Sequence, residues 1–306
     1  MSADLITSRA VIGMMYERLQ NPAAAWVNRL AAKMNSNQAS ETYAWLGMSP
    51  AMAEWAGGRK AQDLREFSFS INNKEHEASL YVKTSELRRD KTGQLMVRIN
   101  ELVDRAVYYP AKLLSTLIEN GESTTCYDGQ YFFDTDHSEG DSGTQDNDIT
   151  SAAATGTSPS ADEMRTAIIK SVKQLLGFKD DRGELVNATA RSFEVMVPLE
   201  YMQPALEAVV LPTVSTGGAN IIPNMPEFSI GVTVNPQLTW TTKFATFVND
   251  GSMRPFILQE EVPATPVAIA EGSEMEVKEK RHMYGVDWEG NVGYGDWKKA
   301  CLCTIT

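Results

Sequence analysis

The chain contains few of the residues on which enzymatic and metal sites usually depend. Its 306 residues include only three histidines and three cysteines. No uninterrupted apolar stretch approaches the roughly 20 residues that a membrane-spanning helix needs, so none is predicted. The N-terminus also lacks a charged and then apolar signal segment, so we expect synthesis in the cytoplasm.

The cysteines form no ligand set that is recognisable from their spacing. Cys301 and Cys303 are two residues apart and would point to the same face of a strand, with no further ligands at metal-binding spacing. Cys126 stands far from both in the sequence. We therefore expect three buried, reduced thiols, and neither a metal site nor a bound cofactor.

Two polar motifs in the middle of the chain imitate functional loops. A calcium loop that starts at Asp134 would need glycine at its sixth position and glutamate at its twelfth, but these are Glu139 and Gln145. The sequence Gly140-Asp141-Ser142-Gly143 imitates the nucleophile motif of trypsin-like proteases, which also require a histidine and an aspartate in a suitable context. None of the histidines offers that context, so no catalytic residues are predicted. The histidines are His76, His137 and His282.

The charge balance is acidic, with 28 Lys and Arg against 40 Asp and Glu and a net charge of −12. Proteins that grip DNA by its phosphates normally show a basic surface, so tight non-specific DNA binding is not expected. The apolar content of 42% and charged content of 22% are those of an ordinary soluble protein. At this length we expect two or more subdomains.

Residues 94–120 give the clearest helix signal. Apolar residues fall on one stripe at helical spacing, and Gly121 closes the segment. Pro110 lies inside it, so we expect a kink or a break there. Such a helix would be about 40 Å long, which suits a spine around which other elements pack. The stripe comprises Ile99, Leu102, Val103, Ala106, Leu113, Leu114 and Leu117.

Residues 64–83 alternate apolar and polar side chains on both sides of the polar sequence Asn72-Asn73-Lys74-Glu75. This pattern predicts a long hairpin whose charged tip projects from the body. Because residues 72–77 contain no large apolar side chain, the tip should add little to the core. His76 is then expected to be a solvated loop residue that titrates near neutrality.

Residues 281–297 alternate glycine with aromatic and branched residues. Glycine supplies turns and aromatic residues favour a pleated surface, so we predict two short strands joined at Glu289-Gly290-Asn291. Trp288 and Trp297 are expected to pack on the long helix at its Leu113 and Leu117 positions. Trp297, which has charged neighbours on both sides, is expected nearer the surface.

The middle of the chain favours a turn, a loop, a helix and a compact unit. Tyr127-Asp128-Gly129-Gln130 predicts a tight turn, because Asp-Gly tolerates positive φ angles. Residues 134–158 are small and polar, which predicts a surface loop. Ser160 is expected to cap a helix, and residues 190–260 indicate an α+β subdomain with a short helix near residues 198–210. The buried stripe of the capped helix would be Met164, Ile168, Val172 and Leu175.

Fragments in constant order along the chain resemble one protein family. The stretch YGVDWEGNVGYGDWKKA is similar to the C-terminal signature of the major head subunits of Mu-like bacteriophages. Two positions depart from the family pattern: His76 stands where an aromatic residue is expected, and Arg89 interrupts a usually acidic turn. The other matching fragments are Tyr43-Ala44-Trp45-Leu46-Gly47, Met52-Ala53-Glu54-Trp55, Gly58-Arg59, Ile71-Asn72-Asn73-Lys74 with Glu77 and Val82, Tyr127-Asp128-Gly129-Gln130-Tyr131-Phe132-Phe133 with His137, Val197-Pro198, Pro204-Ala205-Leu206-Glu207, Gly217-Gly218-Ala219-Asn220 and Arg254-Pro255-Phe256-Ile257.

The resemblance implies an α+β architecture, the Hong Kong 97-type phage capsid fold. On that fold, residues 1–54 would form an N-terminal arm and residues 55–93 an extended loop. A peripheral domain around the spine helix would comprise residues 94–190 and 255–306, and an axial domain residues 191–254. The candidate subunit-interface residues are Trp55, Arg59, Asn73, Lys74, Glu77, Arg88 and Arg89.

The function implied by the resemblance is mechanical: copies of the chain would form an icosahedral head shell around the double-stranded DNA of a tailed phage. Expected partners are the chain itself in pentamers and hexamers, a portal protein, a scaffold with its prohead protease, and a decoration or minor capsid protein. Packaged DNA would make only weak contacts, because an acidic wall repels it. Solubility alone explains the acidic charge equally well. We expect assembly in the host bacterial cytoplasm and a final location in the virion.

Two alternatives stay open at this point. An encapsulin-like shell that encloses protein cargo would use the same fold. A prohead protease or other hydrolase would need a nucleophile, a base and an orienting group, and no such set is found in the sequence.

Overall fold

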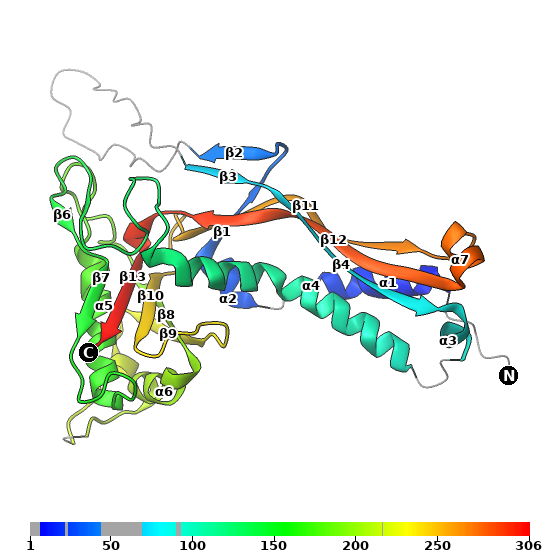
Figure 1. Cartoon of the computed structure of the whole chain (residues 1–306). Helices are drawn as coiled ribbons and strands as arrows, with labels where there is room; N and C mark the ends of the chain where they lie inside the picture. The colour runs from blue at the N-terminus through cyan, green and yellow to red at the C-terminus, as the bar shows by residue number, and fades with distance from the viewer. Residues whose placement is uncertain (1–6, 22–23, 44–68, 90–92, 216) are drawn as a thin grey trace.

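The computed structural model describes residues 7–21, 24–43, 69–89, 93–215 and 217–306. These residues form a compact part, which contains the C-terminus, and a long arm of paired strands with a helix running along it (Figure 1). Helices and strands alternate irregularly along the chain, so the predicted α+β class is confirmed. Among the described residues, no helix is both long enough and apolar enough to cross a membrane.

The arm is a four-stranded sheet in the order β1-β11-β12-β4. Its central strands, β11 and β12, are antiparallel and 14 residues each, which corresponds to about 45 Å of extended chain. Helices α1 and α4 pack along this sheet, and the short helix α7 joins β11 to β12 at the far end (Figure 1). The elements of the arm and its attachment are α1 (Ser8–Leu19), α2 (Ala25–Leu30), β1 (Ala31–Asn35), β4 (Lys74–Lys83), α3 (Thr84–Arg89), α4 (Gln94–Glu119), β11 (Phe256–Ile269), α7 (Glu274–Glu279) and β12 (Arg281–Tyr294).

The compact part is built on a five-stranded sheet in the order β7-β13-β10-β8-β9. Helix α5 packs against this sheet and against α6. As predicted, Ser160 caps α5, in a capping box with Glu163, and the predicted stripe of α5 is buried. The elements of this part are β5 (His137–Ser138), β6 (Thr144–Gln145), β7 (Asp148–Ser151), α5 (Ala161–Gly177), β8 (Ser192–Val197), α6 (Met202–Val210), β9 (Ser229–Val234), β10 (Lys243–Val248) and β13 (Ala300–Ile305), with single 3₁₀ turns at Asn120–Glu122, Leu199–Tyr201, Ile222–Asn224 and Trp297–Lys299.

Helix α4 is the predicted spine, and it links the two parts. Its 26 residues span about 39 Å. Ile99 and Val103 belong to the core of the arm, whereas Leu114 and Ile118 belong to the core of the compact part. Pro110 lies within the helix, and the helix runs unbroken through it, so of the expected kink or break the break is wrong and the kink stays a prediction. Burial of the helix in both cores outweighs the hydrogen bond that proline cannot donate.

The predicted hairpin over residues 64–83 is wrong. Strands β3 (Phe69–Asn72) and β4 are separated by Asn73 alone and do not pair with each other. β3 pairs with β2 (Ser40–Tyr43), and β4 pairs with β12. The polar residues around Asn73 therefore mark the point where one extended segment changes sheets. The alternation was correct for strands, but it does not identify the partner of each strand.

The predicted strand–turn–strand over residues 281–297 is also wrong, because β12 runs without a turn from Arg281 to Tyr294. The glycines of β12 permit close approach of neighbouring strands of the same chain. A Cβ at Gly290 would lie under 3.0 Å from the carbonyl oxygen of Gln259 on β11, and a Cβ at Gly293 would collide with Ile71 on β3. β12 lies between β11 and β4 in the sheet and carries β3 against it, so bulky side chains have no room at these positions.

The division into arm, extended loop, peripheral domain and axial domain stays a prediction. Two of its boundaries nevertheless cut across observed sheets. The five-stranded sheet takes β7 and β13 from outside the predicted axial segment of residues 191–254, and β4, within the predicted extended loop, pairs with β12. Residues 44–68, which hold part of the predicted loop, lie outside the described residues.

Candidate assembly surface and buried polar cluster

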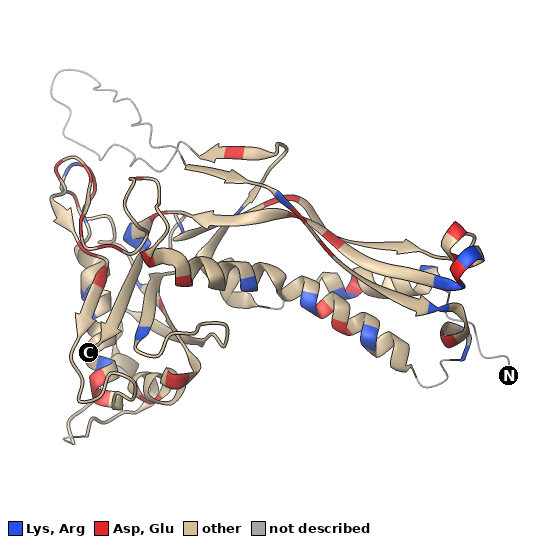
Figure 2. Cartoon of the chain, viewed as in Figure 1, with Lys and Arg blue, Asp and Glu red and all other residues tan. Residues whose placement is uncertain are grey.

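The candidate interface residues do not form one cluster. Trp55 and Arg59 lie outside the described residues, and Arg88 and Arg89 are at the end of α3. Figure 2 shows that acidic and basic residues are interspersed along the arm, with several basic ones at its far end. Of the described candidates, Lys74 and Glu77 lie on β4, and Asn73 lies between β3 and β4. These three are separate in the structure from the two arginines of α3.

Asn73 has a structural role that the sequence did not indicate. Its side-chain amide donates hydrogen bonds to Ser36 Oγ, at 2.8 Å, and to Glu261 Oε2, at 2.9 Å. Its side-chain oxygen accepts one from Gln259, at 2.6 Å. Lys74 and Glu77 are exposed on β4, which has a strand neighbour only on its β12 side among the described residues. These two side chains remain candidates for contact with another copy.

His76 is not the solvated loop residue that we expected. Its ring stacks on Trp288 with centroids 5.1 Å apart, and its Nδ1 lies 3.1 Å from Tyr109 Oη on α4. Burial lowers the pKa of His76, although a contact with the carbonyl of Gly290 opposes this. Trp288 thus reaches the spine helix through Tyr109, whose ring it meets edge-on, one turn before the predicted Leu113.

Helix α6 presents an apolar stripe to solvent, and this is the main surface that the sequence analysis missed. One side of α6 is buried through Ala205 and Ala208. The outward residues recur at helical spacing, three to four residues apart. The composition of this segment could have revealed the exposed residues, because a helix with apolar residues on both sides needs apolar contacts on both sides. The stripe comprises Met202, Leu206 and Val210 of α6 and Leu199 of the preceding 3₁₀ turn, which are 46%, 37%, 68% and 54% exposed.

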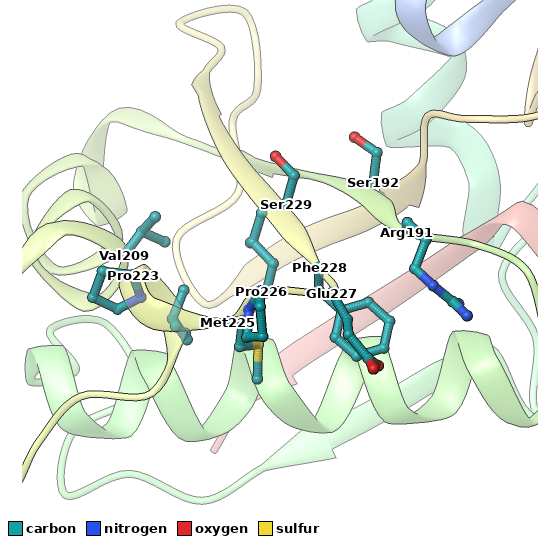
Figure 3. Close-up of a pocket in the computed structure, with 11 residues that line it drawn as sticks. Arg191, Ser192, Val209, Pro223, Met225, Pro226, Glu227, Phe228 and Ser229 are labelled. Carbon is teal, nitrogen blue, oxygen red and sulfur yellow. The ribbon is translucent and has the colours of Figure 1, made fainter.

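A cavity of about 520 Å³ lies next to this helix (Figure 3). It is lined by Val209 of α6, by Arg191 and Ser192, and by apolar and polar residues of the segment that leads into β9. The Arg191 guanidinium lies 5.6 Å from the centre of the Phe228 ring and donates hydrogen bonds to the carbonyls of Ala188 and Ala190. The cavity is therefore of mixed polarity, and its arginine is held by its own chain.

Residues 134–158 are only in part the surface loop that we predicted, because exposed residues alternate with buried ones and three short strands lie in the segment. His137 is completely buried, and Glu139 is 5% exposed. Lys298, also completely buried, donates hydrogen bonds to Glu139 Oε1, at 2.8 Å, and to Tyr127 Oη, at 2.7 Å. The buried polar side chains of this segment form hydrogen bonds with each other and with the C-terminal signature. They do so because buried polar groups need partners.

The buried charges in this cluster shift the pKa values of their neighbours. Burial lowers the pKa of Lys298, but the carboxylates of Asp296 and Glu139 outweigh it and raise the pKa above its ordinary value. Burial and the same carboxylates raise the pKa of Tyr127. Lys298 is therefore a buried ammonium held by carboxylates, and the loss of Lys298 would leave these buried carboxylates without a compensating charge.

Trp297 lies in the same cluster, and the expectation that it is near the surface is wrong. It is fully buried and stacks on His137 with ring centroids 3.9 Å apart. It also meets Phe178 edge-on, at 5.3 Å. Trp297 therefore packs on residues that precede and follow α5. Leu113 and Leu117 border the same hydrophobic core, and direct packing of Trp297 on them stays a prediction.

The predicted Asp-Gly turn is confirmed, and it positions a group of polar side chains. Gly129 has a φ of 89°, and the backbone N–H of Cys126 donates to the carbonyl of Gln130. Asp128 accepts hydrogen bonds from His137 Nδ1, at 2.7 Å, and from Cys126 Sγ, at 3.0 Å. Burial raises the pKa of Asp128, but these bonds outweigh it and lower the pKa. All three cysteines are buried and unpaired, as expected.

This architecture is a capsid-type fold, because it matches solved capsid chains over almost the whole length of this chain. A procapsid structure of bacteriophage JBD30 aligns with 99% of this chain and 76% of that chain, at a TM-score of 0.55 and 22% identity. A JBD30 capsid decorated with minor capsid protein trimers aligns with 93% of this chain and 65% of that one, at a TM-score of 0.52 and 16% identity. At these identities the likeness shows the fold, which is the predicted Hong Kong 97-type capsid fold.

The family follows from the sequence. Residues 8–164 match the model of the Mu-like prophage major head subunit gpT family, so the chain belongs to that family. The major capsid protein of Escherichia phage Mu is 34% identical over 115 residues, which are 38% of each chain. The aligned stretch therefore spans well under half the length of that relative. The family is one of structural head subunits and not of enzymes.

Proposed function

We propose that the chain is the major capsid protein of a Mu-like tailed phage and that it assembles, as pentamers and hexamers, into the icosahedral shell around double-stranded DNA. Family membership and the capsid fold support this proposal. The shell would form in the host bacterial cytoplasm and become part of the virion. No chemical step is assigned to the chain.

The observation that carries the proposal is the exposed apolar stripe of α6. A surface helix normally turns its apolar face to the core and its polar face to water. On α6, Met202, Leu206 and Val210 face solvent in the isolated subunit. Covering apolar area is favourable by about 25 cal/mol per Å². A second copy of the chain, seated on this stripe, would provide that cover.

The elongated shape supports the same conclusion. A long, thin arm gives more surface per residue than a compact body, and obligate interfaces bury upward of about 2,000 Å². The arm of β11, β12 and α4 offers such a surface (Figure 1). Lys74 and Glu77, on the outer strand β4, are proposed contacts along it.

Further partners are proposed by analogy with the family. A portal protein, a scaffold with its prohead protease, and a decoration or minor capsid protein would act with the shell. The decorated JBD30 capsid supports the last of these. DNA inside the shell would make only weak contacts, because the chain carries a net charge of −12.

Light scattering and electron microscopy of the purified chain, with its assembly factors present, test the proposal. Closed shells or capsomers are expected, and a stable monomer at high concentration would refute it. Val210→Asp should abolish shells without changing the denaturant midpoint of the free subunit. Val277→Asp, at a helical valine that is 76% exposed, controls for the effect of the new charge on folding. Shells of normal size from Val210→Asp would show that α6 is not an interface.

The encapsulin-like alternative differs in what the shell contains. Particles from phage-producing cells should hold double-stranded DNA if the proposal is correct. Particles that enclose one kind of cargo protein and no DNA would favour the encapsulin-like alternative.

A further inference from the structure

Three different donor groups lie together in the buried polar cluster, and shell assembly assigns them no role. Cys126, Asp128 and His137 each offer one ligand atom, and these atoms lie within 4.8 Å of one another. The side chains of His137 and Asp128 are 0% and 3% exposed. We propose that these three residues bind a divalent transition-metal ion of the zinc type.

The donor types and their spacing fit such an ion. Zinc binds thiolate sulfur at about 2.3 Å and imidazole nitrogen or carboxylate oxygen at about 2.0–2.2 Å. Tetrahedral geometry then puts sulfur about 3.6 Å and nitrogen about 3.4 Å from the carboxylate oxygen. The contacts are now shorter than this and involve both carboxylate oxygens: Cys126 Sγ lies 3.0 Å from Asp128 Oδ1, and His137 Nδ1 lies 2.7 Å from Asp128 Oδ2. Side-chain rotations that lengthen these contacts by about 0.6 and 0.7 Å would open the site to an ion.

The local structure holds the donors in place before any ion binds. Cys126 and Asp128 both lie at the Asp-Gly turn. Within this turn, the backbone N–H of Gln130 donates a hydrogen bond to Asp128 Oδ1 at 3.1 Å and holds the carboxylate. Stacking on Trp297 holds the imidazole of His137. The carbonyl of Tyr131, 3.9 Å from Cys126 Sγ, is a candidate fourth ligand.

A second observation shows that the protein does not satisfy this cluster completely. His137 Nε2 is buried and has no hydrogen-bond partner among the described residues. Buried polar atoms of this kind usually have a partner, so a missing one indicates a bound water near Nε2. The proposed ion binds the other ring nitrogen, Nδ1, which faces Asp128.

Binding exchanges protons for the ion and transfers no electrons. The Cys126 thiol loses its proton to solvent as the sulfur–metal bond forms. His137 binds through Nδ1 as a neutral imidazole, so the proton of the ring is carried on Nε2. Because the site is buried, the ion would enter during folding or local opening. It would then stabilise the folded chain, since the unfolded chain lacks the assembled ligands.

Cobalt(II) alone is a suitable probe, because thiolate-bound cobalt absorbs in the near ultraviolet through sulfur-to-metal charge transfer. The full chain is unfolded in urea with a phosphine reductant, refolded with Co²⁺ and desalted. We expect stoichiometric cobalt and the sulfur band. Cys126→Ser and His137→Gln should lose the band. Cys303→Ser, at a buried thiol outside the cluster, should keep it.

Thermal unfolding gives a readout that does not depend on the spectrum. The Tm of the wild-type chain and of Cys303→Ser should rise with added Zn²⁺, whereas that of Cys126→Ser should not respond. A refolded wild-type chain with neither the cobalt band nor a zinc-dependent shift would overturn the proposal and leave a hydrogen-bonded network only. A band that persists in Cys126→Ser would overturn the assignment of the sulfur ligand. None of these outcomes depends on shell formation.

Discussion

Replacing Gly290 with alanine tests whether the glycines of β12 serve close packing. The added Cβ would lie under 3.0 Å from the backbone oxygen of Gln259 and from the Trp288 ring. The oxygen belongs to β11, next to Gly290 in the sheet, and cannot move without disturbing the pairing of Glu260 with Gly290. Overpacking of this kind typically costs about 1–3 kcal/mol. We expect a loss at the upper end of that range, because backbone atoms must shift.

The matched control is Gly13→Ala, at a glycine in the middle of α1 where an added Cβ meets nothing within 4 Å. Alanine is the better helix former there, by about 0.5–1 kcal/mol. The assay is thermal and denaturant unfolding of the unassembled subunit. Gly290→Ala should lower the Tm by roughly 4–12 °C, at about 2–4 °C per kcal/mol. If Gly290→Ala proved as stable as Gly13→Ala, the packing explanation of these glycines would be wrong.

Two further predictions concern side chains that join distant segments. Trp297→Ala should cost about 3–5 kcal/mol and give largely insoluble subunits, because it empties a fully buried site against His137 and Phe178; a soluble variant with an unchanged denaturant midpoint would contradict this. Burial raises the pKa of Glu194, but the hydrogen bonds and charge of Arg29 outweigh it and hold the pKa below its ordinary value. The stability from this pair is therefore complete above the unfolded pKa of about 4.3 and is lost as the pH falls through the folded pKa. Denaturant midpoints between about pH 3 and 7 should fall less steeply on acidification in Glu194→Gln than in the wild type, and parallel curves would refute the assignment.

The sequence by itself determined the elements whose stability is local. Helices α4 and α5 follow from apolar spacing, and Ser160 with Glu163 marks the start of α5, since helical hydrogen bonds and caps join residues three or four apart. The turn at Asp128-Gly129 follows from the φ angles that glycine allows. Fragments typical of the family also predicted the fold, because the resemblance applies to the whole chain. They do not show which residues are in contact.

Tertiary structure alone decided which strands pair and what the polar segments do. Alternation over residues 64–83 is the same whether the strands pair with each other or, as here, with β2 and β12. The sequence does not show whether a glycine such as Gly290 lies in a turn or packs closely against a neighbouring backbone. The segment around His137 is polar enough for a surface loop, yet His137 and Glu139 are buried in it because Lys298 and Trp297 pack on them from the far end of the chain. Contacts between residues so distant in sequence leave no periodic pattern in either segment, and only the folded chain brings them together.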